Sequence, residues 1–255
     1  MFDRLQKPFL TVETGEAYQP IRLTYDITQP DKFVDALEQL RCIKKNTTPN
    51  SWSWFWHEEA EDLNFESTDH YRKGEKPLRL GTLTRRDGCL YLNLPSFKRA
   101  CLAAPFFHRH LHADILKINS ADFINKVFAL DERLPHGFTE LFKNDELDRI
   151  LHQRVEDYHK VKELCEDAES PEEAFRILAE FTEKEAKKRL PYAERYIFDM
   201  KKSEDPEVIF LAFYIFLRAR ELVAIKRWFG QTGYSLSDAA EETVVQVFGD
   251  LNIEY

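Results

Sequence analysis

Three histidines stand at alternate positions in the segment HRHLH, where His108, His110 and His112 could offer imidazole ligands to a metal ion. On a helix His108 and His112 are one turn apart and His110 points away, whereas on a strand the outer pair would be ~13 Å apart. In either case this segment supplies two ligands at most, and the others must come from elsewhere, for example from His57, Glu58 or Asp114. The alternative is a partly exposed histidine cluster that gains positive charge below about pH 6.5.

The motifs that usually identify an enzyme do not occur in the sequence. It contains no Gly-x-x-x-x-Gly-Lys or Gly-x-Gly-x-x-Gly phosphate loop, no Gly-x-Ser-x-Gly nucleophile motif and no His-Glu-x-x-His zinc motif. The four cysteines (Cys42, Cys89, Cys101 and Cys165) lie far apart in apolar surroundings, which is typical of packed, reduced thiols. We expect no catalytic residue and no cofactor. A cysteine and a histidine distant in sequence can still meet in the fold, so whether the protein is an enzyme stays open.

The best candidate for a binding site is a basic segment with aromatic residues between its cations. Residues 70–112 contain nine Lys and Arg against two Asp and Glu, with Tyr71, Tyr91 and Phe97 interleaved. Phosphates attract clustered cations and bases stack on aromatic rings, so nucleic acid is one expected ligand. An acidic protein is another, and the third alternative is docking on an acidic part of the same chain. The candidate residues are Arg72, Lys73, Lys76, Arg79, Arg85, Arg86, Lys98 and Arg99.

Charge is distributed unevenly along the chain, whose net charge is −9. Residues 1–130 hold 18 Lys and Arg against 17 acids, whereas residues 131–255 hold 18 against 28. Residues 57–69 carry six acids and no Lys or Arg. The net negative charge opposes non-specific binding of nucleic acid. The two acidic regions, residues 57–69 and residues 131–255, are the alternative docking partners for the basic segment.

Trp52, Trp54 and Trp56 alternate in the segment SWSWFW, so on a strand all three indoles share one face. The opposite face carries Phe55 as its one large apolar residue, so the strand adds little to a core unless the indoles are buried. Three exposed indoles in a row would also favour association. We therefore expect the tryptophan face to be core. The alternatives are a surface for a protein partner and a stacking platform for bases or sugars.

Periodicity and turn signals predict a sheet with helices in the first part of the chain. IRLTYDI (21–27) alternates as a half-buried strand, and RLGTLTRRDGCLYLNL (79–94) predicts a hairpin around Asp87-Gly88. Ser96 is expected to cap the next helix, which Pro105 should kink or end. Further elements are a helix from residue 30, the tryptophan strand and a strand at 114–118.

This order predicts an α+β protein. Residues 1–120 are expected to form a ferredoxin-like α/β sandwich, with an antiparallel or mixed sheet, a hairpin and two helices. Residues 121–255 are expected to form an acidic all-α bundle. Its helix starts are marked by Ser170-Pro171 and Asp205-Pro206.

The longest apolar run, VIFLAFYIFL (208–217), has ten residues, whereas a membrane helix needs ~20. The sequence therefore predicts no contact with a membrane. No signal peptide is evident at the start of the chain, and the isolated cysteines fit a reducing compartment. We expect a cytoplasmic protein.

These observations predict a non-catalytic intracellular protein of macromolecular interaction, an adaptor or regulatory subunit that binds a protein partner. One alternative is a nucleic-acid-binding accessory protein that uses the basic hairpin 72–99. The other is a metal-dependent enzyme built on His57, His108, His110 and His112. The sequence predicts no oligomeric state.

Overall fold

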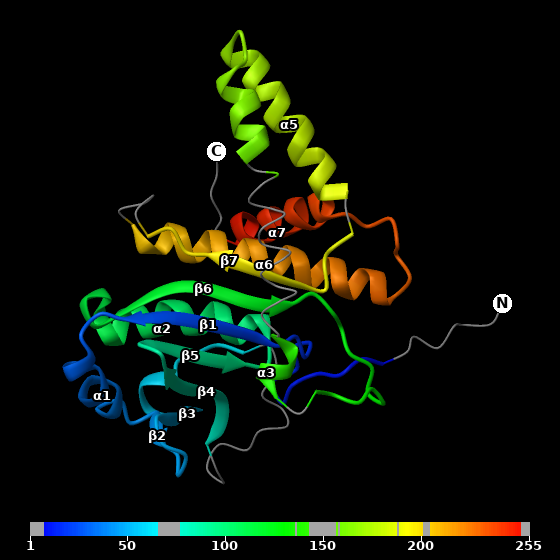
Figure 1. Cartoon of the computed structure of the whole chain (residues 1–255). Coiled ribbons are helices and arrows are strands. Elements are labelled where there is room, and N and C mark those ends of the chain that lie inside the picture. Colours follow the sequence, from blue (N-terminus) through cyan, green and yellow to red (C-terminus); the bar gives the residue numbers. More distant parts are fainter. Residues whose placement is uncertain are drawn as a thin grey trace, which may run out of the picture.

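One antiparallel sheet of seven strands forms the centre of the fold (Figure 1). The computed structural model describes residues 8–65, 77–135, 137–142, 157, 159–187, 189–200 and 205–250. The strands are β1 (Ile21–Ile27), β2 (Ile43–Lys45), β3 (Ser51–Trp56), β4 (Leu78–Arg86), β5 (Cys89–Leu94), β6 (Leu116–Ile124) and β7 (Ala193–Ile197). Their order in the sheet is β2-β3-β4-β5-β1-β6-β7.

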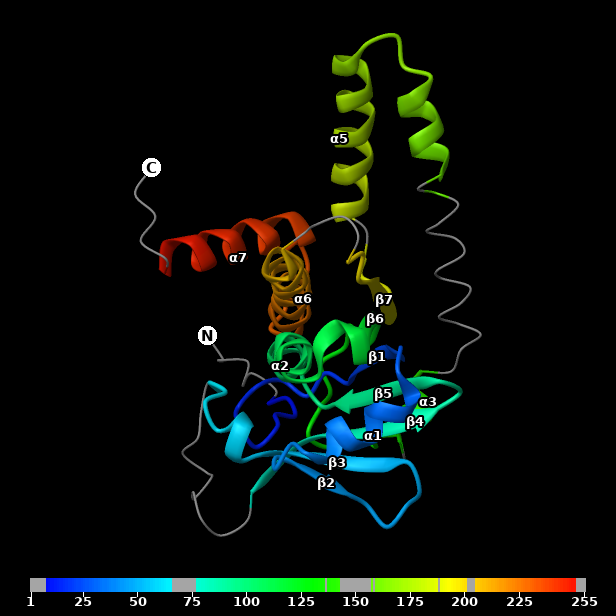
Figure 2. The same cartoon turned by 90° about the vertical axis from the view of Figure 1, so that its left-hand side faces the viewer.

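Six described α-helices complete a mixed α+β fold and confirm the predicted class. The helix α2 lies on the sheet, α6 lies on α2, and α7 packs on α6 (Figure 2). The helix α5 and the helical residues 159–166 project away from this body. None of the described helices is long and apolar enough to cross a membrane. The bounds are α1 (Pro30–Glu38), α2 (Phe97–Ile115), α3 (Phe138–Leu141), α5 (Pro171–Lys187), α6 (Pro206–Trp228) and α7 (Leu236–Asp250).

Local sequence signals position three of these elements. Asp87 and Gly88 have φ values of 53° and 77°, as a tight hairpin turn between β4 and β5 requires. The Ser96 hydroxyl accepts the backbone N–H of Arg99 at 3.2 Å and caps α2. Asp205 caps α6 by accepting the N–H of Glu207 at 2.9 Å. The predicted hairpin and the predicted helix starts are confirmed.

The helix α2 departs from the prediction at Pro105. It continues through this proline and breaks at His112, where φ is 43° and ψ is 142°. The prediction that Pro105 kinks or ends the helix is therefore wrong as to an end, and the non-helical φ and ψ values lie seven residues later, at His112. The rings of Phe106 and Phe107 pack on Trp54 of the sheet, and this burial outweighs the hydrogen bond that a proline removes.

The strand β7 lies in the part of the chain that was predicted to be all helix. It pairs with β6 from Ser120 opposite Ile197 to Ile124 opposite Ala193, so the second half of the chain adds a strand to the sheet. The ferredoxin-like sandwich and the C-terminal all-α bundle are therefore not confirmed. The predicted domain boundary at residue 120 lies inside β6, and the division into two domains stays a prediction.

A buried ion pair connects β7 to α6. Arg220 Nε lies 2.8 Å from Glu194 Oε2, and Arg220 Nη2 lies 3.2 Å from Glu194 Oε1. Both residues are buried, at 6 % and 1 % exposure. Two parallel hydrogen bonds to one carboxylate fix both distance and orientation, so this pair sets how α6 sits against the edge of the sheet.

Trp52 and Trp54 lie in the core, as predicted, with 1 % and 0 % of their surface exposed. The ring of Trp54 lies 5.2 Å from the rings of both Phe106 and Phe107 on α2. Trp56 follows a register shift between Trp54 and Phe55 and is half-buried. The tryptophan row therefore joins the sheet to α2, and its indoles are not a platform for a ligand.

Replacing Trp54 by alanine should lower the free energy of unfolding by about 3–5 kcal/mol, because a large cavity forms between β3 and α2. The matched variant Trp56→Ala should lower it by less than half as much, since that indole is only half-buried. Urea unfolding followed by circular dichroism measures both values. Equal losses of unfolding free energy in the two variants would contradict the deeper burial of Trp54.

Candidate functional site

The face of the sheet opposite α2 carries a row of polar residues across all seven strands. Residues directly opposed in register point to the same face, so their side chains form one line. Their neighbours along the strands, such as Trp52 and Leu92, point to the face that α2 covers. We call the face with this row the polar face, and it is turned towards the viewer in Figure 1. The row is Lys44, Ser53, Thr82, Asn93, Arg22, Asp122 and Arg195.

Hydrogen bonds fix the middle of the row. Arg22 Nε donates to Asn93 Oδ1 at 2.8 Å. Arg195 Nη2 donates to Asp122 Oδ2 at 3.0 Å, and its Nε donates to the same carboxylate. Burial lowers the pKa of Arg22, and the facing carboxylate of Asp122 opposes that shift. The guanidinium of Arg22 is thus held in place between an amide on one strand and an anion on the next.

An aromatic and cationic cluster lies beside this row. The guanidinium carbons of Arg22 and Arg86 each lie 5.6 Å from the centre of the Tyr91 ring. Arg22 also lies 5.3 Å from the ring of Phe142, which follows α3. Contacts of this length are favourable cation–π interactions. We call Arg22, Arg86, Tyr91 and Phe142 the Tyr91 cluster.

Arg86 is the exposed member of the Tyr91 cluster. Its side chain is 66 % exposed, and its Nε lies 3.0 Å from Oδ2 of Asp87, which is 79 % exposed. Ion pairs at such exposure contribute little free energy because water screens them. The guanidinium of Arg86 can therefore exchange this partner for a carboxylate or phosphate of another molecule at small cost.

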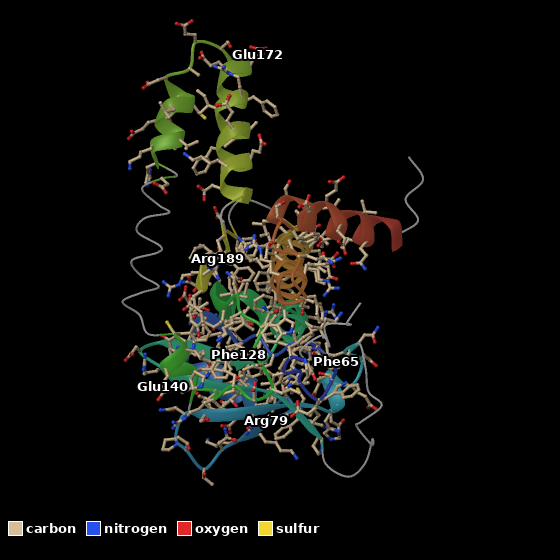
Figure 3. All side chains as sticks on the ribbon, turned by 90° about the vertical axis from the view of Figure 1, so that its right-hand side faces the viewer. Phe65, Arg79, Phe128, Glu140, Glu172 and Arg189 are labelled. Carbon is tan, nitrogen blue, oxygen red and sulfur yellow. The ribbon has the colours of Figure 1, made fainter. Side chains whose placement is uncertain are left out.

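The predicted basic residues do not form one surface. Arg85 and Arg86 are neighbours on β4 and point to opposite faces of the sheet. Arg85 lies 5.9 Å from the ring of Phe33 on α1, on the face that the helices cover. Arg79 is the second residue of the same strand and lies at the end of the molecule opposite Glu172 of α5 (Figure 3). Three more candidates, Arg72, Lys73 and Lys76, lie outside the described residues.

Arg99 and Lys98 face different parts of the protein. Arg99 is 1 % exposed, and its Nη2 lies 3.1 Å from Glu13 Oε2 of the N-terminal segment. Lys98 lines a cavity of about 200 Å³ together with Glu221 of α6. Glu221 pairs with Arg218 of the same helix, so the predicted docking of the basic segment on the acidic second half stays a prediction, whereas Arg99 pairs within the first half.

The three clustered histidines lie on α2 but have different surroundings. The ring of His108 packs at 5.4 Å on Phe210, and the ring of His110 packs at 4.5 Å on Phe106. Burial lowers the pKa of both imidazoles, so each becomes charged only at more acidic pH than a free histidine. His112 stands at the break in the helix.

The metal site predicted at these histidines gains no geometric support. Its fourth candidate ligand, His57, lies with its Nε2 3.3 Å from Oε1 of the neighbouring Glu58. Within the described part of the chain, no three His, Cys, Asp or Glu side chains are grouped so that they could hold a metal ion. Metal binding stays a prediction from the sequence.

Comparisons of the chain with protein-family models, with curated proteins and with solved structures gave no match. The polar face offers cations, an aromatic ring, hydroxyls and an amide. Such groups are suited to binding. The alternation in IRLTYDI predicts that Arg22 lies on the polar side of its strand. The strand β7 has only five residues, too few for an alternating pattern that would have predicted the position of Arg195.

Cys42 and Cys101 are poor nucleophiles in this fold. Burial, with a hydrogen bond from the thiol to Glu59, raises the pKa of Cys42 to about 12. Burial also raises the pKa of Cys101 on α2. Because the thiolate is the reactive form, neither residue is activated at neutral pH.

In the native protein at about pH 8, Cys42 and Cys101 should react with iodoacetamide at least about tenfold more slowly than in the urea-unfolded chain. The half-buried Cys165 on the projecting helix serves as internal control and should be labelled before them. Mass spectrometry of peptides after timed quenching measures the three rates. Labelling of Cys42 at the unfolded rate would contradict its raised pKa.

Proposed function

We propose that this protein is a non-catalytic macromolecular-interaction protein, an adaptor or regulatory subunit of the cytoplasm, that binds a protein partner over its polar face. The observation that carries this proposal is the Tyr91 cluster, in which one ring contacts the guanidinium groups of Arg22 and Arg86. Tyrosine and arginine are enriched among the residues that contribute most of the binding energy in protein interfaces. A rigid ring between two cations needs little ordering when a partner binds.

The chemistry of the polar face favours a partner with carboxylates beside an apolar residue. Arg195 and Asp122 neutralise each other at one end of the row. Arg86 has a surface ion pair with Asp87, and Arg22 donates to the neutral amide of Asn93 and faces Asp122, whose charge Arg195 already balances. Positive charge therefore gathers around Tyr91, and an acidic partner would complement it and associate faster at low salt.

Nucleic acid is the second candidate, and the same cluster favours it. Single-stranded RNA binds open sheet faces by stacking its bases on aromatic rings while cations contact its phosphates. Tyr91 and Arg86 would supply one such ring and one such cation. The net charge of −9 repels any acidic ligand at long range, and it repels nucleic acid more strongly than an acidic protein because the phosphate backbone carries a charge at every nucleotide.

We further propose that the first part of the chain is a ferredoxin-like unit with strands added at both edges. Support comes from the strand order β4-β5-β1-β6 with α1 and α2 between the strands in sequence, as in a β-α-β-β-α-β unit. In this interpretation β2 and β3 extend one edge and β7 the other. The predicted acidic helical domain would then consist of α5, α6 and α7.

The variants Arg86→Glu and Arg85→Glu test the polar face with a matched pair. Both reverse one charge at adjacent positions of β4, but only Arg86 lies in the Tyr91 cluster. Tagged wild-type protein and Arg85→Glu should capture the same partner from a lysate of the source, and Arg86→Glu should capture at least about tenfold less of it. Quantitative mass spectrometry with and without nuclease measures the difference.

Three outcomes of this capture experiment separate the alternatives. Equal loss with both variants would show that the net charge of the hairpin matters and would contradict binding at the polar face. Loss of every partner on nuclease treatment would favour nucleic acid. Equal capture by the wild type and both variants would show that the Tyr91 cluster does not contribute to binding of the captured partner.

A further inference from the structure

Two helices lie side by side and project from the body of the fold, the helical residues 159–166 and α5 (Figures 1 and 2). We call residues 159–187 the projecting hairpin. Its turn lies far from the sheet, since Glu172 at the start of α5 and Arg79 on β4 stand at opposite ends of the molecule (Figure 3). This placement leaves the turn open to another molecule.

Local interactions hold the turn of the hairpin in one conformation. Ser170 Oγ accepts the backbone N–H of Glu173 at 3.2 Å, and Glu173 Oε2 accepts the backbone N–H of Glu169 at 3.0 Å. These two bonds cap the start of α5. The Cys165 thiol donates to the carbonyl oxygen of Ala174 at 3.5 Å and so connects the two helices. The surface of the turn is therefore ordered before a partner binds, which lowers the entropic cost of binding.

The outer face of α5 exposes two apolar side chains one helical turn apart. Phe175 is 73 % exposed, the highest value of any large apolar residue in the described part of the chain, and Leu178 is 48 % exposed. Residues three apart on a helix are neighbours on one face, so these two side chains form one apolar stripe. A lone exposed apolar residue needs no explanation, whereas an apolar stripe on a projecting helix indicates a binding surface.

The turn beside this stripe is strongly negative. Residues 163–175 carry six Asp and Glu and no Lys or Arg, and the whole projecting hairpin carries nine Asp and Glu against five Lys and Arg. Two of these five cations, Lys162 and Arg176, form ion pairs with glutamates of the hairpin. Glu172 precedes Phe175 by three residues, so a carboxylate borders the apolar stripe directly.

This charge decides which partner fits the stripe. A second copy of the chain would bring another hairpin of the same negative charge to the contact, and the phosphates of nucleic acid would be repelled as well. A basic helix, in contrast, complements the turn with its Lys and Arg and covers the stripe with its apolar face. The net charge of −9 also attracts a basic partner at long range.

We propose that the projecting hairpin is a docking site for an amphipathic basic helix of a partner protein. The apolar side chains of the partner pack on Phe175 and Leu178, and its cations lie beside Glu172 and the other acids of the turn. Amphipathic helices bind through anchors at positions i and i+3, which is the spacing of Phe175 and Leu178. The site takes a partner of the opposite charge from the one expected at the Tyr91 cluster, so either site can fail without the other.

Fluorescence anisotropy with a labelled amphipathic peptide of leucine and lysine, about 18 residues or five helical turns long, tests this site on the full chain. The same peptide with glutamate in place of lysine is the matched control. At low salt the lysine peptide should bind at least about tenfold more tightly than the glutamate peptide, and its affinity should fall as salt screens the exposed charges. Equal binding of the two peptides, or no binding of the lysine peptide up to about 100 μM, would overturn the proposal.

Serine variants locate the binding on the apolar stripe. Phe175→Ser and Leu178→Ser each remove one anchor, whereas Leu130→Ser removes a side chain that is 59 % exposed on a loop of the body. Each of the first two variants should weaken binding of the lysine peptide at least about fivefold, and Leu130→Ser should leave it unchanged. Circular dichroism checks that all three variants fold. Equal weakening by the three variants would overturn the location.

A pair of charge variants separates the local charge of the turn from the charge of the whole chain. Glu172→Lys and the matched variant Glu241→Lys on α7 change the net charge equally. Only Glu172→Lys should weaken binding of the lysine peptide, at least about threefold, and an equal effect of both would overturn a local site. A wild-type dimer in analytical ultracentrifugation that Phe175→Ser abolishes would also overturn the proposal, because a second copy would then cover the stripe.

Discussion

Burial of α2 against one face of the sheet is the constraint on which the rest of the structure depends. Trp54 packs on Phe106 and Phe107, and Tyr25 on the central strand β1 also contacts Phe107, at 6.1 Å. Because side chains alternate along a strand, a slip of one residue in any pairing would turn apolar residues to the outside. The packing of α2 thereby fixes the register, and the polar row on the opposite face follows from that register.

A cavity of about 730 Å³ lies between the N-terminal segment and strands β3 to β5, where this regular pairing is interrupted. The register between β3 and β4 shifts after Trp54, which pairs with Gly81. A Cβ atom at Gly81 would lie 2.6 Å from Leu94 Cδ2 and 2.9 Å from the carbonyl oxygen of Asn93, so only glycine lets the two strands approach there. The shift leaves Leu80 of β4 without an opposed residue, and Phe55 of β3 lies on the same face as Ser53, in the wall of the cavity.

The sequence predicted correctly those elements whose structure depends on residues adjacent in the chain. The Asp87-Gly88 turn, the Ser96 cap and the buried tryptophans each depend on a few adjacent residues, and each was predictable. The surroundings of Arg99 were not, because its partners Glu13 and Thr14 are more than 80 residues away in the chain. The separation of Arg85 from Arg86 could have been predicted, since neighbours on a strand point to opposite faces. Treating the segment as one basic patch ignored this alternation.

The polar face and the cavity share one side chain. Asn93 accepts the hydrogen bond from Arg22 Nε and also lines the cavity. Asn93 and Arg22 are opposed residues on neighbouring strands, so the register of the sheet places the wall of the cavity directly beside the guanidinium that lies over Tyr91.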